Sequence, residues 1–282
     1  MAFTNVNLGV EYMRQGAYEK ALAKFNRAVK ADPKYALTYN MLGILYQLLE
    51  DPELAEKNFK QSLKLEADDP SALNNYGQFL CKQDRRIEAE ESFLAAAGNP
   101  FYATPELAYT NAGSCAYLHE DVEVAEKYFQ RGLSVNPEMP LALSQMAQIT
   151  FERGELAVAR DYLNRYLEVA SHTPKTLWLG IRIERKFDDL DKLASYSMLL
   201  KNKYPDSLEA ELFRISDEYS RSAKLAVDEK KTSPAPKKTE TRSSSPLAST
   251  HSFADNNSGL LSEVDLSLYP VYLEERDLLG PE

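Results

Sequence analysis

The strongest constraint on this chain is a block of residues that recurs with a spacing of 34 positions near the N-terminus. Each copy sets a large residue beside a small one and later places an alanine four positions before a phenylalanine. The copies begin at Leu8, Leu42 and Tyr76, and their later pairs are Ala21/Phe25, Ala55/Phe59 and Ala89/Phe93. A fixed period of this length predicts a stack of similar units, each of which buries its apolar face against the next.

The block resembles the tetratricopeptide repeat (TPR), in which two antiparallel helices are joined by a short turn. Small residues such as Gly9 and Ala28 allow two helices to approach closely, and large ones such as Leu8 and Phe25 fill the space between neighbouring pairs. The predicted fold class is all-α, a right-handed TPR superhelix of about six helix-turn-helix repeats with a C-terminal capping helix and a disordered tail.

The repeats can be aligned at about 2–35, 36–69, 70–103, 106–139, 140–173 and 174–207. The next segment, 208–228, is predicted to be the capping helix because it carries one apolar stripe: Leu208, Leu212, Ile215 and Tyr219. Residues 229–282 are rich in Lys, Ser, Pro and Asn, which predicts a largely disordered tail. The short apolar segment near 260–273 is either incidental or a docking motif, and a docking motif could fold back as an autoinhibitor.

Composition and motifs argue against catalysis, metal binding and nucleic-acid binding. The net charge is −10, and no basic stripe of the kind that nucleic acid requires runs along the repeats. The three histidines form no i, i+4 pair and neither HExxH nor CxxC occurs, so no metal site or cofactor is expected. Because the many carboxylates fall mainly on outward helix faces, the prediction is a non-enzyme.

The first helix of each repeat is expected to line a partner-binding groove. In repeats one and two this groove opens with mostly apolar residues: Phe3, Val6, Val10, Met13, Leu37, Asn40, Ile44, Gln47 and Leu48. Later repeats contribute amides, chiefly Asn74, Asn75, Gln78 and Asn111. Apolar side chains with amides that bind peptide backbone predict a partner held as a helix or an extended peptide. The alternatives are that a segment preceding Met1 covers this surface, or that it is a packing surface.

The two cysteines fall in neighbouring first helices, Cys81 in repeat three and Cys115 in repeat four. First helices of adjacent repeats stack side by side, so the two sulfur atoms could come within bonding distance. Position alone leaves two outcomes open, a disulfide in an oxidising compartment or two buried free thiols.

Repeats three and four carry a more specific pattern. It runs Asn74-Asn75-Tyr76-Gly77-x-Phe79-Leu80-Cys81, Glu88-Ala89-x-x-x-Phe93, Asn99-Pro100-x-Tyr102-x-Thr104-Pro105 and Asn111-Ala112-Gly113-x-Cys115. Over about 4–213 the chain resembles the PilF/PilW-type TPR lipoproteins of type IV pilus biogenesis and stability in Gram-negative bacteria. The resemblance implies a disulfide between Cys81 and Cys115 and a lipid anchor at the periplasmic face of the outer membrane. It also implies a pilotin role, in which the protein helps the secretin subunit reach that membrane and assemble.

The expected partners on this resemblance are the secretin subunit and other pilus assembly proteins, in support of twitching motility. The lipoprotein signal is expected to precede Met1 in the precursor, because the sequence shows neither a signal peptide nor a lipid-acceptor cysteine before the first repeat. The main alternative is a cytoplasmic TPR adaptor that binds an unrelated protein. A transferase that has lost its catalytic domain has no support in the residues.

Overall fold

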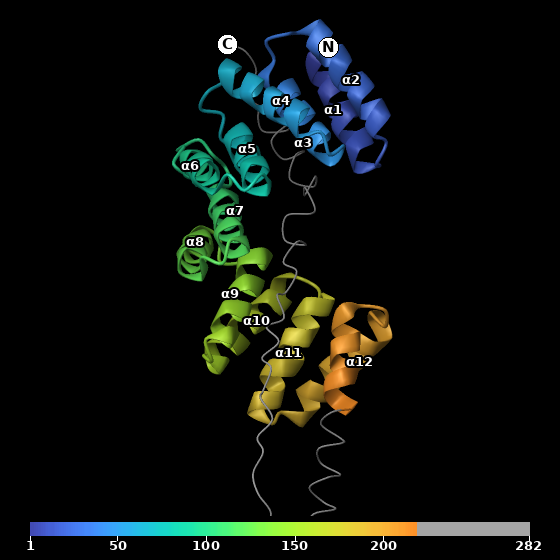
Figure 1. Ribbon diagram of the computed structural model, residues 1–282, viewed down its shortest axis with the longest axis vertical. Coiled ribbons are helices and arrows are strands. Elements are labelled where there is room, and N and C mark those ends of the chain that lie inside the picture. The colour runs from blue at the N-terminus through green and yellow to red at the C-terminus, as the bar shows by residue number, and fades with distance from the viewer. Residues whose placement is uncertain (219–282) are drawn as a thin grey trace, which may run out of the picture. The chain divides into compact units, whose positions relative to one another are not determined.

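The computed structural model describes residues 1–218, and within that part every regular element is a helix. The helices follow one another in antiparallel pairs (Figure 1): α1 (Ala2–Arg14) and α2 (Tyr18–Ala31), α3 (Ala36–Leu48) and α4 (Pro52–Leu65), α5 (Pro70–Lys82) and α6 (Arg86–Ala97), α7 (Pro105–Leu118) and α8 (Val122–Val135), α9 (Pro140–Glu152) and α10 (Leu156–Val169), α11 (Pro174–Phe187) and α12 (Leu190–Lys203). A further helical stretch runs from 208 to 218. The predicted all-α TPR fold is confirmed, whereas the tail predicted at 229–282 and its segment near 260–273 lie outside the described residues.

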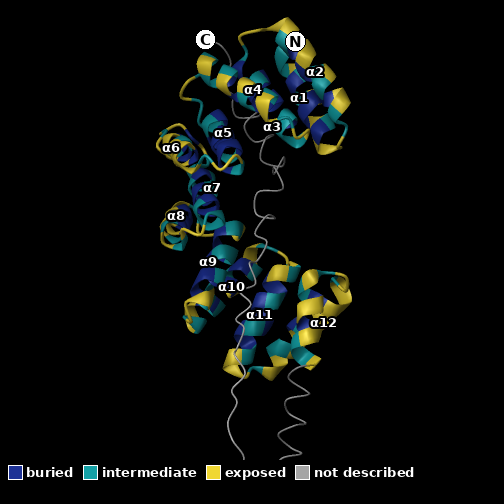
Figure 2. Ribbon diagram, in the orientation of Figure 1, coloured by how far each residue is buried: buried dark blue, intermediate teal, exposed yellow. Residues whose placement is uncertain are grey.

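The described chain divides into two compact units, Met1–Ala142 and the residues from Leu143 onward. In both units the buried residues follow the helix sides that face a neighbouring helix (Figure 2). The core of the first unit is built on phenylalanines of the second helices, among them Phe25, Phe59 and Phe93. Leu8 differs from its counterpart Leu42, since Leu8 is 42% exposed and Leu42 is 4% exposed. The prediction that Leu8 fills space between repeats is therefore wrong, because its side chain is not covered by any of the helices in the described part of the chain.

Each helix pair of the first unit is held close by a glycine that lies against an aromatic ring. A Cβ atom added at Gly43 of α3 would lie 2.6 Å from the ring of Phe59 in α4, and equivalent short approaches occur at Gly9, Gly77 and Gly113. Repeat five differs at both positions, with Ala147 in α9 and Leu163 in α10, both buried. The added methyl group is thus matched by a smaller partner side chain, which preserves the packing volume.

We expect Gly43→Ala to lower the free energy of unfolding by about 1–3 kcal/mol, even though alanine favours a helix by about 1 kcal/mol. The reason is that Phe59 is fully buried, so its ring has no space into which it can retreat. Phe59→Leu reproduces the pair seen in repeat five and should offset part of that loss. Urea unfolding of the wild type, both single variants and the double variant measures the coupling, and strictly additive effects would contradict this account.

The turns inside the helix pairs share one backbone feature. One residue of each turn has a left-handed φ of 53° to 84°, and these residues are Gly16, Glu50, Asp84, Glu120, Gly154 and Asp188. Successive turns are 34 residues apart except across Thr104-Pro105, where two additional residues lengthen the step to 36. This spacing supports the division into six repeats, which otherwise remains a prediction.

The helical stretch from 208 buries a different face from the one predicted. Ala210 and Phe213 are buried in a cluster with Leu177 and Leu200, whereas Leu208 is 69% exposed. Ile215 and Leu212 are also exposed, so the predicted apolar stripe is wrong at its three described positions, and Tyr219 lies outside the described residues. The aromatic ring of Phe213 gains more from burial than a leucine would, and two cations, Arg185 and Lys201, lie over it.

A charged network joins the second and third helix pairs. Glu56 of α4 accepts hydrogen bonds from Arg85 (2.6 Å) and from the hydroxyl of Tyr76 (3.1 Å), and Lys60 pairs with it at 2.7 Å. Hydrogen bonds from Lys60 and Arg85 lower the pKa of Glu56 from 4.5 to about 2. Its ionised form is therefore favoured in the folded state.

This shift predicts how stability depends on pH. Since the folded pKa of Glu56 is depressed, its contribution is present above about pH 4.5 and is lost as the pH falls towards 2. We expect Glu56→Gln to reduce the acid-induced loss of unfolding free energy over this range by about 1–2 kcal/mol, a figure lowered for partial exposure. Chemical unfolding at several pH values measures it, with Glu53→Gln on the same helix as the control. A wild type and a Glu56→Gln variant with parallel pH profiles would contradict the assignment.

Candidate functional site

In the first unit, the first helix of each pair packs against the first helix of the next pair: α1 against α3, α3 against α5 and α5 against α7. This arrangement buries much of the groove that the sequence predicts. Val6, Val10, Met13 and Ile44 are at most 4% exposed and belong to the main hydrophobic cluster. Their predicted role as an accessible apolar lining is corrected, because their side chains form part of the core. A glutamate at Val10 would bury a carboxylate and would test folding more than binding.

The predicted amides form a ladder between successive first helices. Asn75 of α5 donates a hydrogen bond from Nδ2 to Oδ1 of Asn40 in α3, at 3.1 Å. Asn111 of α7 makes the same contact with Oδ1 of Asn74 in α5, at 2.9 Å. Asn40, Asn74 and Asn75 are buried, so their predicted role as accessible groove amides is corrected. Part of their hydrogen-bonding capacity instead holds the repeats together.

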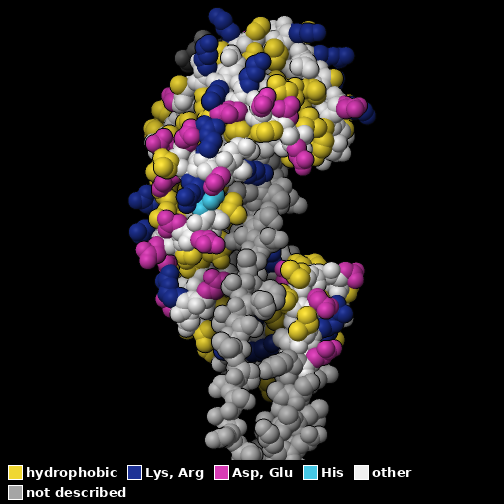
Figure 3. All heavy atoms as spheres, in the orientation of Figure 1, with side chains coloured by type: hydrophobic (Ala, Val, Ile, Leu, Met, Phe, Trp, Pro, Cys, Tyr) yellow, Lys and Arg dark blue, Asp and Glu magenta, His cyan; other side chains and the backbone are white. Residues whose placement is uncertain are grey.

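The remaining predicted groove residues are half-buried and stay accessible. We call them the first-helix face, and they are Phe3, Leu37, Gln47, Leu48, Gln78 and Asn111. They combine apolar side chains from α1 and α3 with amides from α3, α5 and α7, which suits an extended or helical peptide. On the visible side of the described residues, cationic and anionic side chains are interspersed (Figure 3), so a concentration of charge does not single out a site there.

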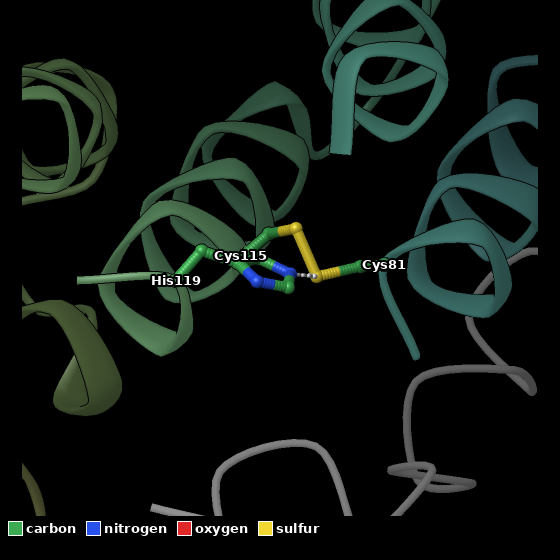
Figure 4. A group of neighbouring side chains, drawn as sticks. All are labelled: Cys81, Cys115 and His119. Atoms are coloured by element: carbon green, nitrogen blue, oxygen red, sulfur yellow. Dashed lines mark hydrogen bonds between the residues drawn. A yellow bond between two sulfur atoms is a disulfide. The ribbon is translucent and has the colours of Figure 1, made fainter. Parts of the chain in front are cut away.

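Cys81 of α5 and Cys115 of α7 form a disulfide, with a Cα–Cα distance of 5.9 Å. His119, at the C-terminal end of α7, points towards the disulfide (Figure 4). Its Nε2 atom lies 3.9 Å from Sγ of Cys81, and its Nδ1 atom lies 3.3 Å from a carboxylate oxygen of Asp84. The disulfide therefore links neighbouring first helices and has an oriented imidazole beside it.

A pocket of about 430 Å³ opens beside the disulfide, and Cys115, His119 and Tyr128 contribute to its wall. Burial, together with a hydrogen bond to Glu90, raises the pKa of Tyr128 to about 12, so its hydroxyl stays protonated at neutral pH. His119 was not predicted as part of a site, because it forms no i, i+4 pair with another histidine. The i, i+4 spacing of Cys115 and His119 was the signal that could have identified this group.

Comparison with known proteins shows where this architecture occurs. Residues 1–65 and 110–172 match models of the tetratricopeptide repeat family. The type IV pilus assembly protein PilF of Pseudomonas aeruginosa is 30% identical over 209 residues, which are 74% of this chain and 83% of PilF. This chain belongs to the PilF/PilW family of TPR proteins. The solved structure of Pseudomonas aeruginosa PilF superposes with a TM-score of 0.70 and 29% identity, covering 76% of this chain and 97% of the PilF chain in that structure.

A second PilF/PilW structure gives the same result. PilW, described as a widely conserved type IV pilus biogenesis factor, has 30% identity and a TM-score of 0.67 over 75% of this chain and 97% of PilW. A similarity of another kind is to the human protein O-mannosyl-transferase TMTC2, which is 37% identical over 93 residues. That match spans only 11% of TMTC2, whereas the PilF/PilW matches cover most of the relatives. Within residues 1–218, no helix of this PilF/PilW family member is both long enough and apolar enough to cross a membrane.

Proposed function

We propose that this protein is a non-catalytic scaffold of type IV pilus biogenesis that acts as a pilotin. It binds the secretin subunit and supports the localisation of that subunit to the outer membrane and its assembly there. The observation that carries the proposal is the similarity to PilF, which extends over 83% of the relative at 30% identity. The location we propose is the periplasmic face of the outer membrane, with a lipid anchor supplied by the precursor, and membership of the PilF/PilW family supports it.

Two features of the molecule support this proposal. The disulfide between Cys81 and Cys115 is suited to an oxidising compartment such as the periplasm. The first-helix face offers half-buried apolar side chains beside amides, which is a chemistry for holding a peptide segment without a nucleotide or a catalytic group. Binding would raise the local concentration of the secretin and cover surface that would otherwise aggregate.

The cellular experiment is deletion of the gene in its own host, followed by assay of the secretin in separated membranes. Loss of the protein should shift the secretin from outer-membrane multimers to monomers, and expression of the full precursor should restore the multimers. Cells in which secretin multimers form normally in the outer membrane without this protein would exclude the pilotin role. Loss of pili with normal secretin multimers would instead place the protein at another step of pilus assembly.

A further inference from the structure

The group formed by Cys81, Cys115 and His119 has the composition of a metal site. Their ligand atoms, two sulfurs and one ring nitrogen, all lie within 4.8 Å of one another. Both cysteines are buried, and His119 is partly buried at the pocket wall. Thiolate and imidazole are common ligands of Zn²⁺ in proteins, and two cysteines with one histidine leave one position for water.

The distances require little movement. In a tetrahedral zinc site, ligand nitrogen and sulfur atoms are about 3.6 Å apart and two sulfurs about 3.8 Å apart. Nε2 of His119 is already 3.9 Å from Sγ of Cys81. The two sulfur atoms are bonded to each other in the disulfide. After reduction they can separate by rotation of the two cysteine side chains, while the Cα atoms of Cys81 and Cys115 stay 5.9 Å apart.

Asp84 completes the arrangement. Nδ1 of His119 faces the Asp84 carboxylate at 3.3 Å, so this nitrogen is placed to carry the proton and donate it. The lone pair of the neutral ring is then on Nε2, the atom that faces the sulfurs (Figure 4). A carboxylate that orients a histidine in this way is the usual outer partner of a zinc-bound imidazole.

The pocket beside the group gives a cation access. Its wall carries more carboxylates than cationic side chains: Asp84, Glu88, Glu90 and Asp121 against Arg85 and Arg86. An excess of negative charge at the entrance favours the approach of a divalent cation.

We infer that Cys81, Cys115 and His119 form a redox-gated Zn²⁺ site, closed by the disulfide and opened when a dithiol reduces it. The dithiol supplies two electrons and two protons, becomes a disulfide itself, and leaves two thiols on the protein. Binding of Zn²⁺ then forms two metal–sulfur bonds and one metal–nitrogen bond, and the two thiol protons pass to water. The metal-bound form would keep α5 and α7 joined when the covalent link is absent.

The test uses the full chain and Co²⁺ as a spectroscopic probe for Zn²⁺. We expect the reduced wild type to bind stoichiometric Co²⁺ with a thiolate charge-transfer band that Zn²⁺ displaces, and the oxidised protein to show no such band. His119→Ala should weaken Co²⁺ binding by more than about tenfold, and Asp84→Asn by about 10- to 100-fold with the spectrum retained. His172→Ala, in the second unit, is the matched control and should bind as the wild type does.

The inference is overturned if the reduced wild type shows no thiolate band, or if His119→Ala keeps the wild-type affinity and spectrum. If reduction of the disulfide destabilises the fold, thermal unfolding of the reduced proteins still tests the site. Zn²⁺ should then raise the Tm of the reduced wild type by several degrees but leave that of reduced His119→Ala unchanged. Equal effects of Zn²⁺ on both proteins would also reject the site.

Discussion

Arg160→Met is expected to lower the free energy of unfolding by about 3 kcal/mol, because it leaves a buried carboxylate without its main cation. Glu184 of α11 is 1% exposed, and Arg160 of α10 lies 2.7 Å from its Oε2 atom. The same guanidinium reaches Asp189 at 2.6 Å and packs over the Phe187 ring. Methionine retains the apolar stem, so the loss reports mainly on the charge.

A second variant separates the effect of the unpaired Glu184 carboxylate from the effect of lost packing. Adding Glu184→Gln to Arg160→Met removes the unpaired carboxylate and should recover more than half of the stability lost. Urea unfolding of the wild type, both single variants and the double variant provides the values. Lys192, with its Nζ atom 4.0 Å from Glu184, is too distant to replace Arg160 fully. A loss of less than about 1 kcal/mol for Arg160→Met would show that this ion pair is not a structural element of the second unit.

Removal of the disulfide should have an effect of similar size in the first unit. For a loop closed across 34 residues, the chain-entropy model gives a stabilisation of about 3–4 kcal/mol, which Cys81→Ala/Cys115→Ala should lose. Because contacts in a repeat array are mostly between neighbours, amide hydrogen exchange should accelerate first in α5 to α8. The wild type reduced in the presence of a metal chelator is the matched comparison. An oxidised wild type no more stable than the double variant would contradict the prediction.

The fold could be predicted from the sequence because its determinants are local and periodic. The contact between Gly43 and Phe59 requires a small residue and a large one at a set spacing, and that spacing recurs along the chain. The predicted tail lies outside the described residues. The prediction for the helical stretch from 208 failed at Leu208, because periodicity does not reveal which apolar face a neighbouring core accepts.

The candidate site was harder to predict than the fold. Positions along one first helix indicate which side chains point away from the second helix. They do not indicate whether the next first helix covers those side chains, so the sequence predicts an open groove at Val10 and Ile44, which the structure buries. The role of Asn40 and Asn75 depends on an inter-repeat hydrogen bond that needs three-dimensional placement. His119 belongs to a group contributed by two helices, of which the sequence shows only the spacing to Cys115.

The most direct measurement of the central claim is binding of the full chain to the purified secretin subunit. Gln47→Glu/Gln78→Glu places two charges on the first-helix face, and Gln15→Glu/Gln130→Glu places the same charges on exposed residues elsewhere. We expect the wild type and the second variant to bind equally, and the first to bind at least about tenfold more weakly, a difference of about 1.4 kcal/mol. No binding by the wild type would contradict the pilotin proposal, and equal binding by both variants would contradict its placement on the first-helix face.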